Sequence, residues 1–110
     1  MEVSALDGKS FRKVDFLVDS GAFLTVLPEK EWKAIKLKSK GEQSFSLADG
    51  RVIKRKVGYA LIRYGKHEGP CKVVLGEVDD SPLLGVTALE ALGLVLDPLK
   101  RKLYEPQMML

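Results

Sequence analysis

The chain has 110 residues, which suits one domain, and we expect that domain to span residues 1–110. Its charged fraction of 30% and hydrophobic fraction of 45% are those of a soluble globular protein. The net charge of +3 and the scattered aromatic residues, 7% of the chain, provide neither a dense basic footprint nor a stacking platform, so no nucleic-acid partner is expected.

Cysteine content and the N-terminal residues bear on the cellular compartment. The single cysteine, Cys71, excludes an intrachain disulfide and is interpreted as a buried small hydrophobic residue. Met1–Ser4 lacks the basic and apolar character of a signal peptide, and no apolar run reaches transmembrane length. We therefore expect a cytoplasmic location and no membrane partner.

The first part of the chain predicts short strands and one helix. Asp7-Gly8 is a hairpin-turn signal between two segments that are expected to pair as antiparallel strands. Pro28 fits the first position of a short helix in which Trp32 is a packing anchor. The expected elements are strands over residues 1–6, 11–18 and 24–27 and a helix over residues 29–35.

The second part predicts more strands and a second helix. Ala48-Asp49-Gly50-Arg51 carries an Asp-Gly turn signal at the tip of a hairpin. Thr87 and Glu90 match a helix capping box, and Gly93 suits the residue after the helix end. The expected strands are 44–47, 52–59, 59–64, 71–75, 94–96 and 102–104, with a turn at 65–69 and a helix over 87–92. An all-β single domain with one or two short helices follows.

One carboxylate stands at the end of an apolar run and directly before a tight turn. Phe16-Leu17-Val18 predicts a buried strand, and Ser20-Gly21 is turn chemistry, so Asp19 is expected to be held rigidly at the rim of a core. An Asp in this position is equally typical of simple turn capping. These residues alone leave both interpretations open.

The rest of the chain favours catalysis. In order, it carries Asp19-Ser20-Gly21-Ala22, the hairpin around residues 46–52, and the triplet Leu83-Leu84-Gly85. From about Val14 to Tyr104 the sequence resembles the retropepsin-like aspartic peptidases. The resemblance implies a closed β-barrel of the acid-protease fold.

The same resemblance implies a role for each motif. Asp19 is the catalytic residue, Ser20 bonds across a dimer axis, Gly21 lets backbone N–H groups approach the carboxylates, and Ala22 lines the cleft floor. Leu84 and Gly85 pack beneath the active-site loop. The tip residues Ala48, Asp49, Gly50 and Arg51 form a substrate-binding flap, although their charge departs from the glycine-rich flap of the retroviral enzymes.

The mechanism of that family requires two carboxylates sharing one proton, and this chain has one Asp-Ser-Gly. Asp79-Asp80 has no glycine turn after it, and Asp49 belongs to the hairpin. The second carboxylate must then come from Asp19 of another copy, so a homodimer is expected to hydrolyse extended polypeptide by water activation. We expect apolar cleft walls that include Val26, Leu83 and Val86.

Other chemistries are less well supported. His67 and Cys71 are too few for a zinc site, no third group is evident for a thiol nucleophile, and no phosphate-binding glycine loop is present. We therefore predict no metal and no cofactor. Two alternatives to a free-standing peptidase stay open: a non-catalytic peptide-binding or dimerisation module with the same fold, and a domain of a longer polyprotein.

Overall fold

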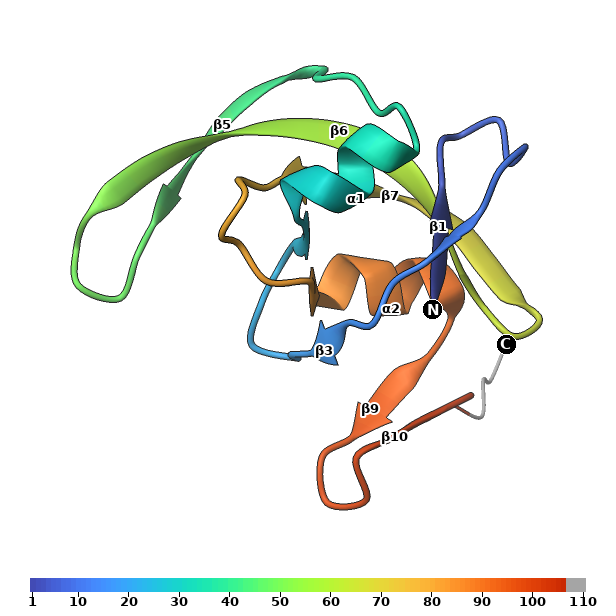
Figure 1. The fold of residues 1–110 in the computed structure, drawn as a ribbon. Helices are drawn as coiled ribbons and strands as arrows, with labels where there is room; N and C mark the ends of the chain where they lie inside the picture. The colour runs from blue at the N-terminus through green and yellow to red at the C-terminus, as the bar shows by residue number, and fades with distance from the viewer. Residues whose placement is uncertain (107–110) are drawn as a thin grey trace.

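The computed structural model describes residues 1–106, which contain ten strands and two helices (Figure 1). Residues 107–110 of the predicted domain lie outside the described residues. In chain order the elements are β1 (Glu2–Ser4), β2 (Arg12–Lys13), β3 (Leu17–Val18), β4 (Thr25–Leu27), α1 (Glu29–Ala34), β5 (Gly41–Ser46), β6 (Val52–Tyr64), β7 (His67–Leu75), β8 (Leu83–Leu84), α2 (Val86–Leu92), β9 (Val95–Asp97) and β10 (Lys102–Tyr104).

Eight of these strands form one mixed sheet. Its order is β2-β1-β6-β7-β4-β8-β3, and β5 pairs with β6 off this path. The pairs β4·β7 and β3·β8 are parallel, and the other neighbours are antiparallel. Figure 1 shows β6 as a long arc that runs from an outlying hairpin into the body, so that the sheet curls into a half-barrel. The predicted all-β fold with two short helices is confirmed. The sheet is a half-barrel and not the expected closed barrel, since its end strands β2 and β3 do not pair with each other.

The hydrophobic core lies between α2 and the curled sheet. Leu27, Ile62, Val73 and Leu84 from four strands are completely buried there, and Ala88 of α2 joins them. On β7, Gly69 lies so close to the last turn of α2 that an added Cβ would be 2.3 Å from the carbonyl oxygen of Ala91. This glycine therefore allows the helix to pack directly on the sheet.

The predicted N-terminal hairpin is present, but its second strand is divided. β1 pairs with β2 across a turn in which Gly8 has a φ of 64°. The predicted strand 11–18 is interrupted after Lys13. Its first part, β2, pairs with β1, whereas its last part, β3, pairs with β8 at the far end of the sheet. This crossing carries the chain over the body and delivers Asp19 to the opposite edge.

The middle of the chain has fewer interruptions than predicted. The two strands expected at 52–59 and 59–64 form the single strand β6, in which Gly58 pairs with Val73 without breaking the ladder. β7 starts at His67, four residues earlier than expected, because Gly65, with a φ of 59°, and Lys66 suffice for the turn.

The predicted helices and the last strand pair are present. Pro28 precedes α1 immediately, and the indole Nε1 of Trp32 donates a hydrogen bond to the carbonyl of Gly76 at 2.8 Å. β9 and β10 form their own antiparallel pair, which projects from the lower end of the molecule in Figure 1. Within residues 1–106, neither helix has the length and apolar character needed to cross a membrane.

Candidate active site

Asp19 lies at the first position after β3, in a turn that fixes its backbone and its carboxylate. Its N–H donates to the carbonyl of Leu84 at 3.0 Å, and its own carbonyl accepts the N–H of Ala22 at 3.1 Å. The Oδ1 atom accepts the N–H of Gly21 at 2.8 Å. Among the described residues no partner is found for Oδ2, and the side chain is exposed. The turn thus presents a fixed carboxylate with one oxygen available.

Glycine at position 21 leaves room for the Asp19 carboxylate. A Cβ there would lie 3.2 Å from Oδ1 of Asp19, which is tighter than ordinary contact. Ser20 is exposed at the outer corner of the turn, and Ala22 is half-buried. The hydrogen bond from Ser20 across a dimer axis stays a prediction, because it requires a second chain.

The segment from Leu84 to Val86 lies directly beneath the Asp19 turn. Leu84 is completely buried and pairs with Val18. The N–H of Val86 donates to the carbonyl of Ala22 at 2.8 Å. At Gly85 an added Cβ would be 2.6 Å from both the carbonyl carbon and the oxygen of Leu24, so no other residue fits without moving the backbone.

Two threonines that the sequence analysis did not assign to the site join these segments. The hydroxyl of Thr25, completely buried in β4, accepts the N–H of Gly85 at 3.0 Å. The hydroxyl of Thr87 donates to the carbonyl of Phe23 at 3.1 Å. The predicted capping box at Thr87 is wrong: α2 starts at Val86 after Gly85 and has no side-chain cap, so Thr87 lies inside the first turn.

Replacing Thr25 by Val is expected to lower the free energy of unfolding by about 1 to 3 kcal/mol, because the buried N–H of Gly85 loses its acceptor. Denaturant unfolding measures the loss, and amide exchange at Gly85 locates it. Thr25→Ser is the control, since it removes a methyl group but keeps the acceptor. Unchanged protection of the Gly85 amide in Thr25→Val would contradict this assignment.

An apolar cavity of about 580 Å³ lies between the β5–β6 hairpin and the body. The hairpin contributes the apolar side chains Phe45, Leu47 and Ile53 to it. The body contributes Leu17, Ala22, Phe23, Leu24, Val26, Val74, Pro82 and Leu83. Of the predicted wall residues, Val26 and Leu83 line the cavity, whereas Val86 does not, because it starts α2 on the far side of Gly85.

The hairpin tip is closed by local polar contacts. The N–H of Leu47 donates to the carbonyl of Arg51 at 2.8 Å, and Gly50 has a φ of 88°. Arg51 Nε is 2.6 Å from Oδ2 of Asp49, so the two charges at the tip are paired with each other. Ala48 and its neighbours therefore form the predicted hairpin loop, whereas their role as a substrate flap stays a prediction.

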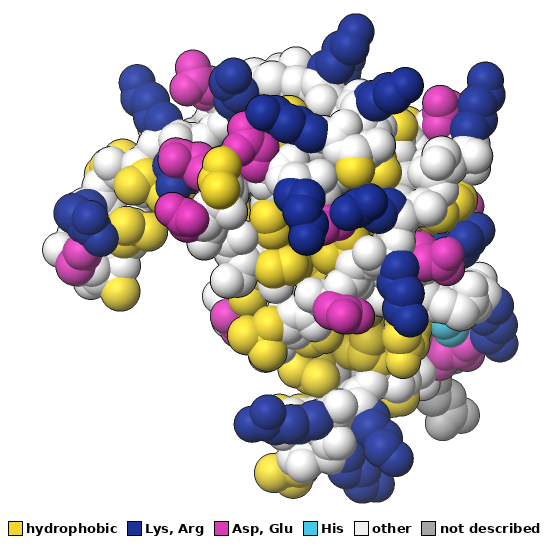
Figure 2. All heavy atoms as spheres, in the orientation of Figure 1, with side chains coloured by type: hydrophobic (Ala, Val, Ile, Leu, Met, Phe, Trp, Pro, Cys, Tyr) yellow, Lys and Arg dark blue, Asp and Glu magenta, His cyan; other side chains and the backbone are white. Residues whose placement is uncertain are grey.

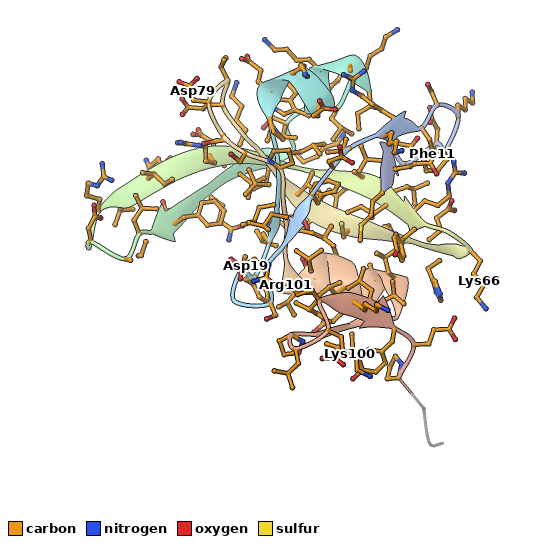
Figure 3. The ribbon with its side chains drawn as sticks, turned by 60° about the horizontal axis from the view of Figure 1, so that its bottom comes forward. Phe11, Asp19, Lys66, Asp79, Lys100 and Arg101 are labelled. Atoms are coloured by element: carbon orange, nitrogen blue, oxygen red, sulfur yellow. The ribbon has the colours of Figure 1, made fainter. Side chains whose placement is uncertain are left out.

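A second, smaller cavity is lined by Asp19 and by the cationic side chain of Arg101. Arg101 of the β9–β10 hairpin lies beside Asp19 in Figure 3, and both residues line a cavity of about 440 Å³. Leu17, Val18, Leu96, Pro98 and Leu103 complete its lining. No local signal identifies Arg101, because the fold alone brings residues 19 and 101 together.

In the part of the chain that the structure describes, Cys71 and His67 do not form a second reactive site. Burial raises the pKa of the Cys71 thiol to about 12, so this residue is a poor nucleophile at neutral pH. His67 lies 2.9 Å from Glu105 at the other end of the sheet. Within residues 1–106, no group of three or more His, Cys, Asp or Glu side chains is arranged to hold a metal ion.

The fold and the site together define the class of protein. An aspartyl protease-like domain has three features that are present here. They are a curled β-sheet, an Asp-Ser-Gly turn with a Leu-Gly segment packed beneath it, and a hairpin beside an apolar cavity. Residues 6–91 match the family model described as gag-polyprotein putative aspartyl protease, and no curated protein matches the chain. Since the match covers well over half of its length, the chain belongs to this retroviral-type aspartyl protease family.

Proposed function

We propose that the protein is an aspartic endopeptidase that works as a homodimer and cleaves extended polypeptide. The observation that carries the proposal is the Asp19 carboxylate, which is exposed, fixed through Oδ1 by the N–H of Gly21, and next to an apolar cavity. A turn that served only to cap the chain would need neither the cavity nor the close support from Gly85.

A second copy would complete the site. Leu17 and Phe23, on either side of the Asp19 turn, are 67% and 70% exposed, so this turn is surrounded by apolar surface that a partner would cover. Figure 2 shows hydrophobic side chains spread over the body between the two projecting hairpins. The facing turn of the partner would bring in the second Asp19 carboxylate.

The proposed chemistry needs only these two groups and a water molecule. Two carboxylates about 3 Å apart cannot both ionise, so the pair holds one proton. The ionised Asp19 removes a proton from the attacking water, and the protonated Asp19 donates a hydrogen bond to the scissile carbonyl. The titration belongs to the pair, and we expect activity where the pair holds one proton.

The cavity supports a preference for apolar side chains near the cut. An extended peptide lying between the hairpin and the body would place alternate side chains against Phe45, Ile53 and Leu83. The second candidate function rests on the same cavity, because a peptide-binding module with this fold would hold the segment without cutting it.

A cleavage assay over protein concentration distinguishes these functions. An unfolded protein and a mixed peptide pool are incubated between about pH 3 and pH 7, the range in which a carboxylate pair changes protonation. If the site is shared, specific activity rises with protein concentration in step with the dimer fraction measured by sedimentation. A stable dimer that binds peptides but cleaves none at any pH would favour the binding module.

A further inference from the structure

One charged side chain lies on the inner face of the β5–β6 hairpin, among apolar ones. Along β6 the residues Ile53, Arg55 and Val57 face inward, whereas Lys54 and Lys56 are exposed. Arg55 lines the apolar cavity, and its side chain is only 21% exposed. Strand alternation predicts an apolar residue at this position, so the arginine calls for a specific explanation.

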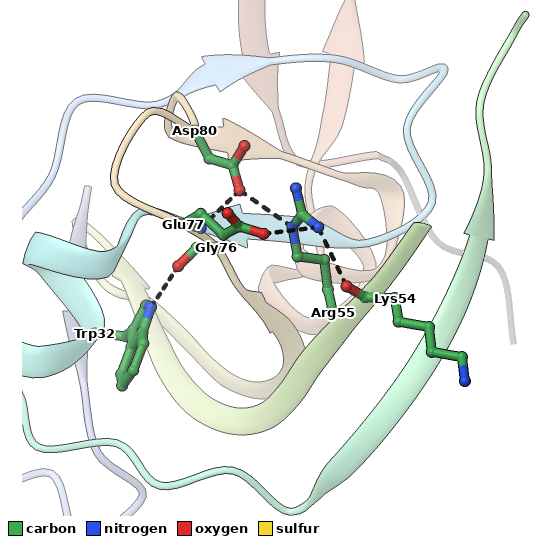
Figure 4. Close-up of polar contacts among 6 residues, drawn as sticks. All are labelled: Trp32, Lys54, Arg55, Gly76, Glu77 and Asp80. Carbon is green, nitrogen blue, oxygen red and sulfur yellow. Dashed lines mark hydrogen bonds and ion pairs between the residues drawn. The ribbon is translucent and has the colours of Figure 1, made fainter. Parts of the chain in front are cut away.

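Two carboxylates of the opposite wall bind this guanidinium (Figure 4). Arg55 Nη1 lies 2.9 Å from Oε1 of Glu77, and Arg55 Nε lies 3.5 Å from Oδ2 of Asp80. The Nη1 atom also donates to the carbonyl of Lys54 at 3.1 Å. The cluster thus spans from the hairpin to the turn between β7 and β8.

That turn is itself firmly attached to the body. Oδ2 of Asp80 accepts the N–H of Glu77 at 2.7 Å, and the N–H of Asp80 donates back to the carbonyl of Glu77 at 3.2 Å. The N–H of Gly76 donates to the carbonyl of Leu27 at 2.8 Å, while the Gly76 carbonyl accepts the Trp32 indole. Arg55 therefore binds a rigid partner and not a loose loop.

The turn between β7 and β8 continues directly into the segment that holds Asp19 in place. Two residues after Asp80, the carbonyl of Pro82 accepts the N–H of Leu17 at 3.2 Å, and β8 then holds Asp19 through Leu84. A short path of chain and hydrogen bonds thus connects the inner face of the hairpin with the Asp19 turn.

We propose that Arg55 is a positioning residue, which fixes the β5–β6 hairpin at a set height over the apolar cavity by binding Glu77 and Asp80. Its effect on turnover rests on the proposed peptidase function, whereas its effect on the hairpin does not. A hairpin that is already fixed over the cavity loses less conformational freedom when a peptide binds, so the contact favours substrate binding more than the chemical step.

The contact differs from an ordinary surface ion pair. Lys33 and Glu29, for comparison, lie four residues apart on α1, and the lysine is 61% exposed, so that pair constrains nothing beyond its own helix. Arg55 instead joins segments more than twenty residues apart, and it lies between two cavities, both of which it lines. Its side chain is 21% exposed and that of Asp80 31%, whereas that of Glu77 is 67% exposed. Removal of Arg55 leaves Asp80 facing apolar surface without its cation.

Hydrogen exchange of the hairpin decides the structural part without any need for activity. In the Asp19→Asn background, Arg55→Met is expected to speed exchange of the amides at residues 43–53 roughly fivefold or more, since hydrogen bonds to charged groups are lost. Lys54→Met is the matched control on the outer face and leaves these rates unchanged. Equal exchange rates in the two variants would overturn the proposal.

Further variants separate positioning from general damage. Arg55→Lys keeps the charge but loses the planar fork, so its exchange rates lie between those of the wild type and Arg55→Met. The double variant Glu77→Gln/Asp80→Asn, tested in place of Arg55→Met, removes both carboxylate charges from the opposite wall and gives the same change. If this double variant leaves exchange over residues 43–53 unaltered, the contact does not hold the hairpin.

Peptide kinetics test the consequence for turnover. Where the wild type cleaves, Arg55→Met raises KM several-fold more than it lowers kcat, and Arg55→Lys recovers part of the difference. A fall in kcat alone would refute the positioning role. Absence of wild-type cleavage would refute the peptidase proposal, while the exchange comparison would still decide the role of Arg55.

Discussion

Replacing Asp19 by Asn is expected to reduce peptide cleavage by about 10²- to 10⁴-fold or more, the usual contribution of a general acid–base pair. An amide cannot take a proton from water, and in a homodimer one substitution removes both carboxylates. The Asn carbonyl oxygen can still accept the N–H of Gly21, so the turn and the fold should survive. Product formation followed by mass spectrometry measures the loss.

Mixing the two proteins tests whether the site is shared. When wild type is equilibrated with a growing excess of Asp19→Asn, activity should fall as wild-type homodimers are replaced by mixed dimers. Asp7→Asn is the matched control, because Asp7 lies in the N-terminal hairpin and, among residues 1–106, its carboxylate accepts only the N–H of Lys9. If the excess of Asp19→Asn leaves activity unchanged, the carboxylate does not act across a dimer.

Replacing Gly85 by Ala is expected to cost about 3 kcal/mol of unfolding free energy, at the upper end of the usual range for overpacking. The added Cβ would meet backbone atoms of Leu24 at 2.6 Å and of Phe23 at 2.9 Å, which cannot rotate away. The turn above must shift, so Asp19 would be displaced as well. Urea unfolding at fixed protein concentration measures the change.

Gly50→Ala serves as the comparison for that measurement. Gly50 has a φ of 88° but no atom within 4 Å of an added Cβ, so only backbone strain, about 1 kcal/mol, is expected. The difference between the two variants then reports the steric overlap at Gly85. An equal loss in both would show that the segment beneath Asp19 adapts easily.

Local signals predicted much of the fold because the turns depend on a few residues. Gly8, Gly50 and Gly93 all adopt the positive φ that their turns require, with values of 64°, 88° and 70°. The capping box failed for a non-local reason: Gly85 must pack against Leu24, and this contact, not the hydroxyl of Thr87, determines where α2 starts. Tertiary packing overrode a local preference.

Some residues of the candidate site could likewise be predicted from local motifs, and others could not. Asp19 and the tip at Asp49-Gly50 could be identified from short motifs, because each is a local turn. Thr25 and Arg55 act through partners that are distant in the chain, Gly85 in one case and Asp80 in the other. A buried threonine or an inward arginine has no periodic signature, so only the fold reveals its role.

The parallel pairing of β3 with β8 has a consequence for the time at which the site forms during synthesis. Leu17 and Val18 pair with Leu83 and Leu84, and this closure spans most of the chain. Contacts so distant in sequence form late in folding, because a large loop must close first. On the ribosome, the Asp19 turn is without its support until the segment around Gly85 has emerged, so a shorter nascent chain cannot yet hold Asp19 in its final position.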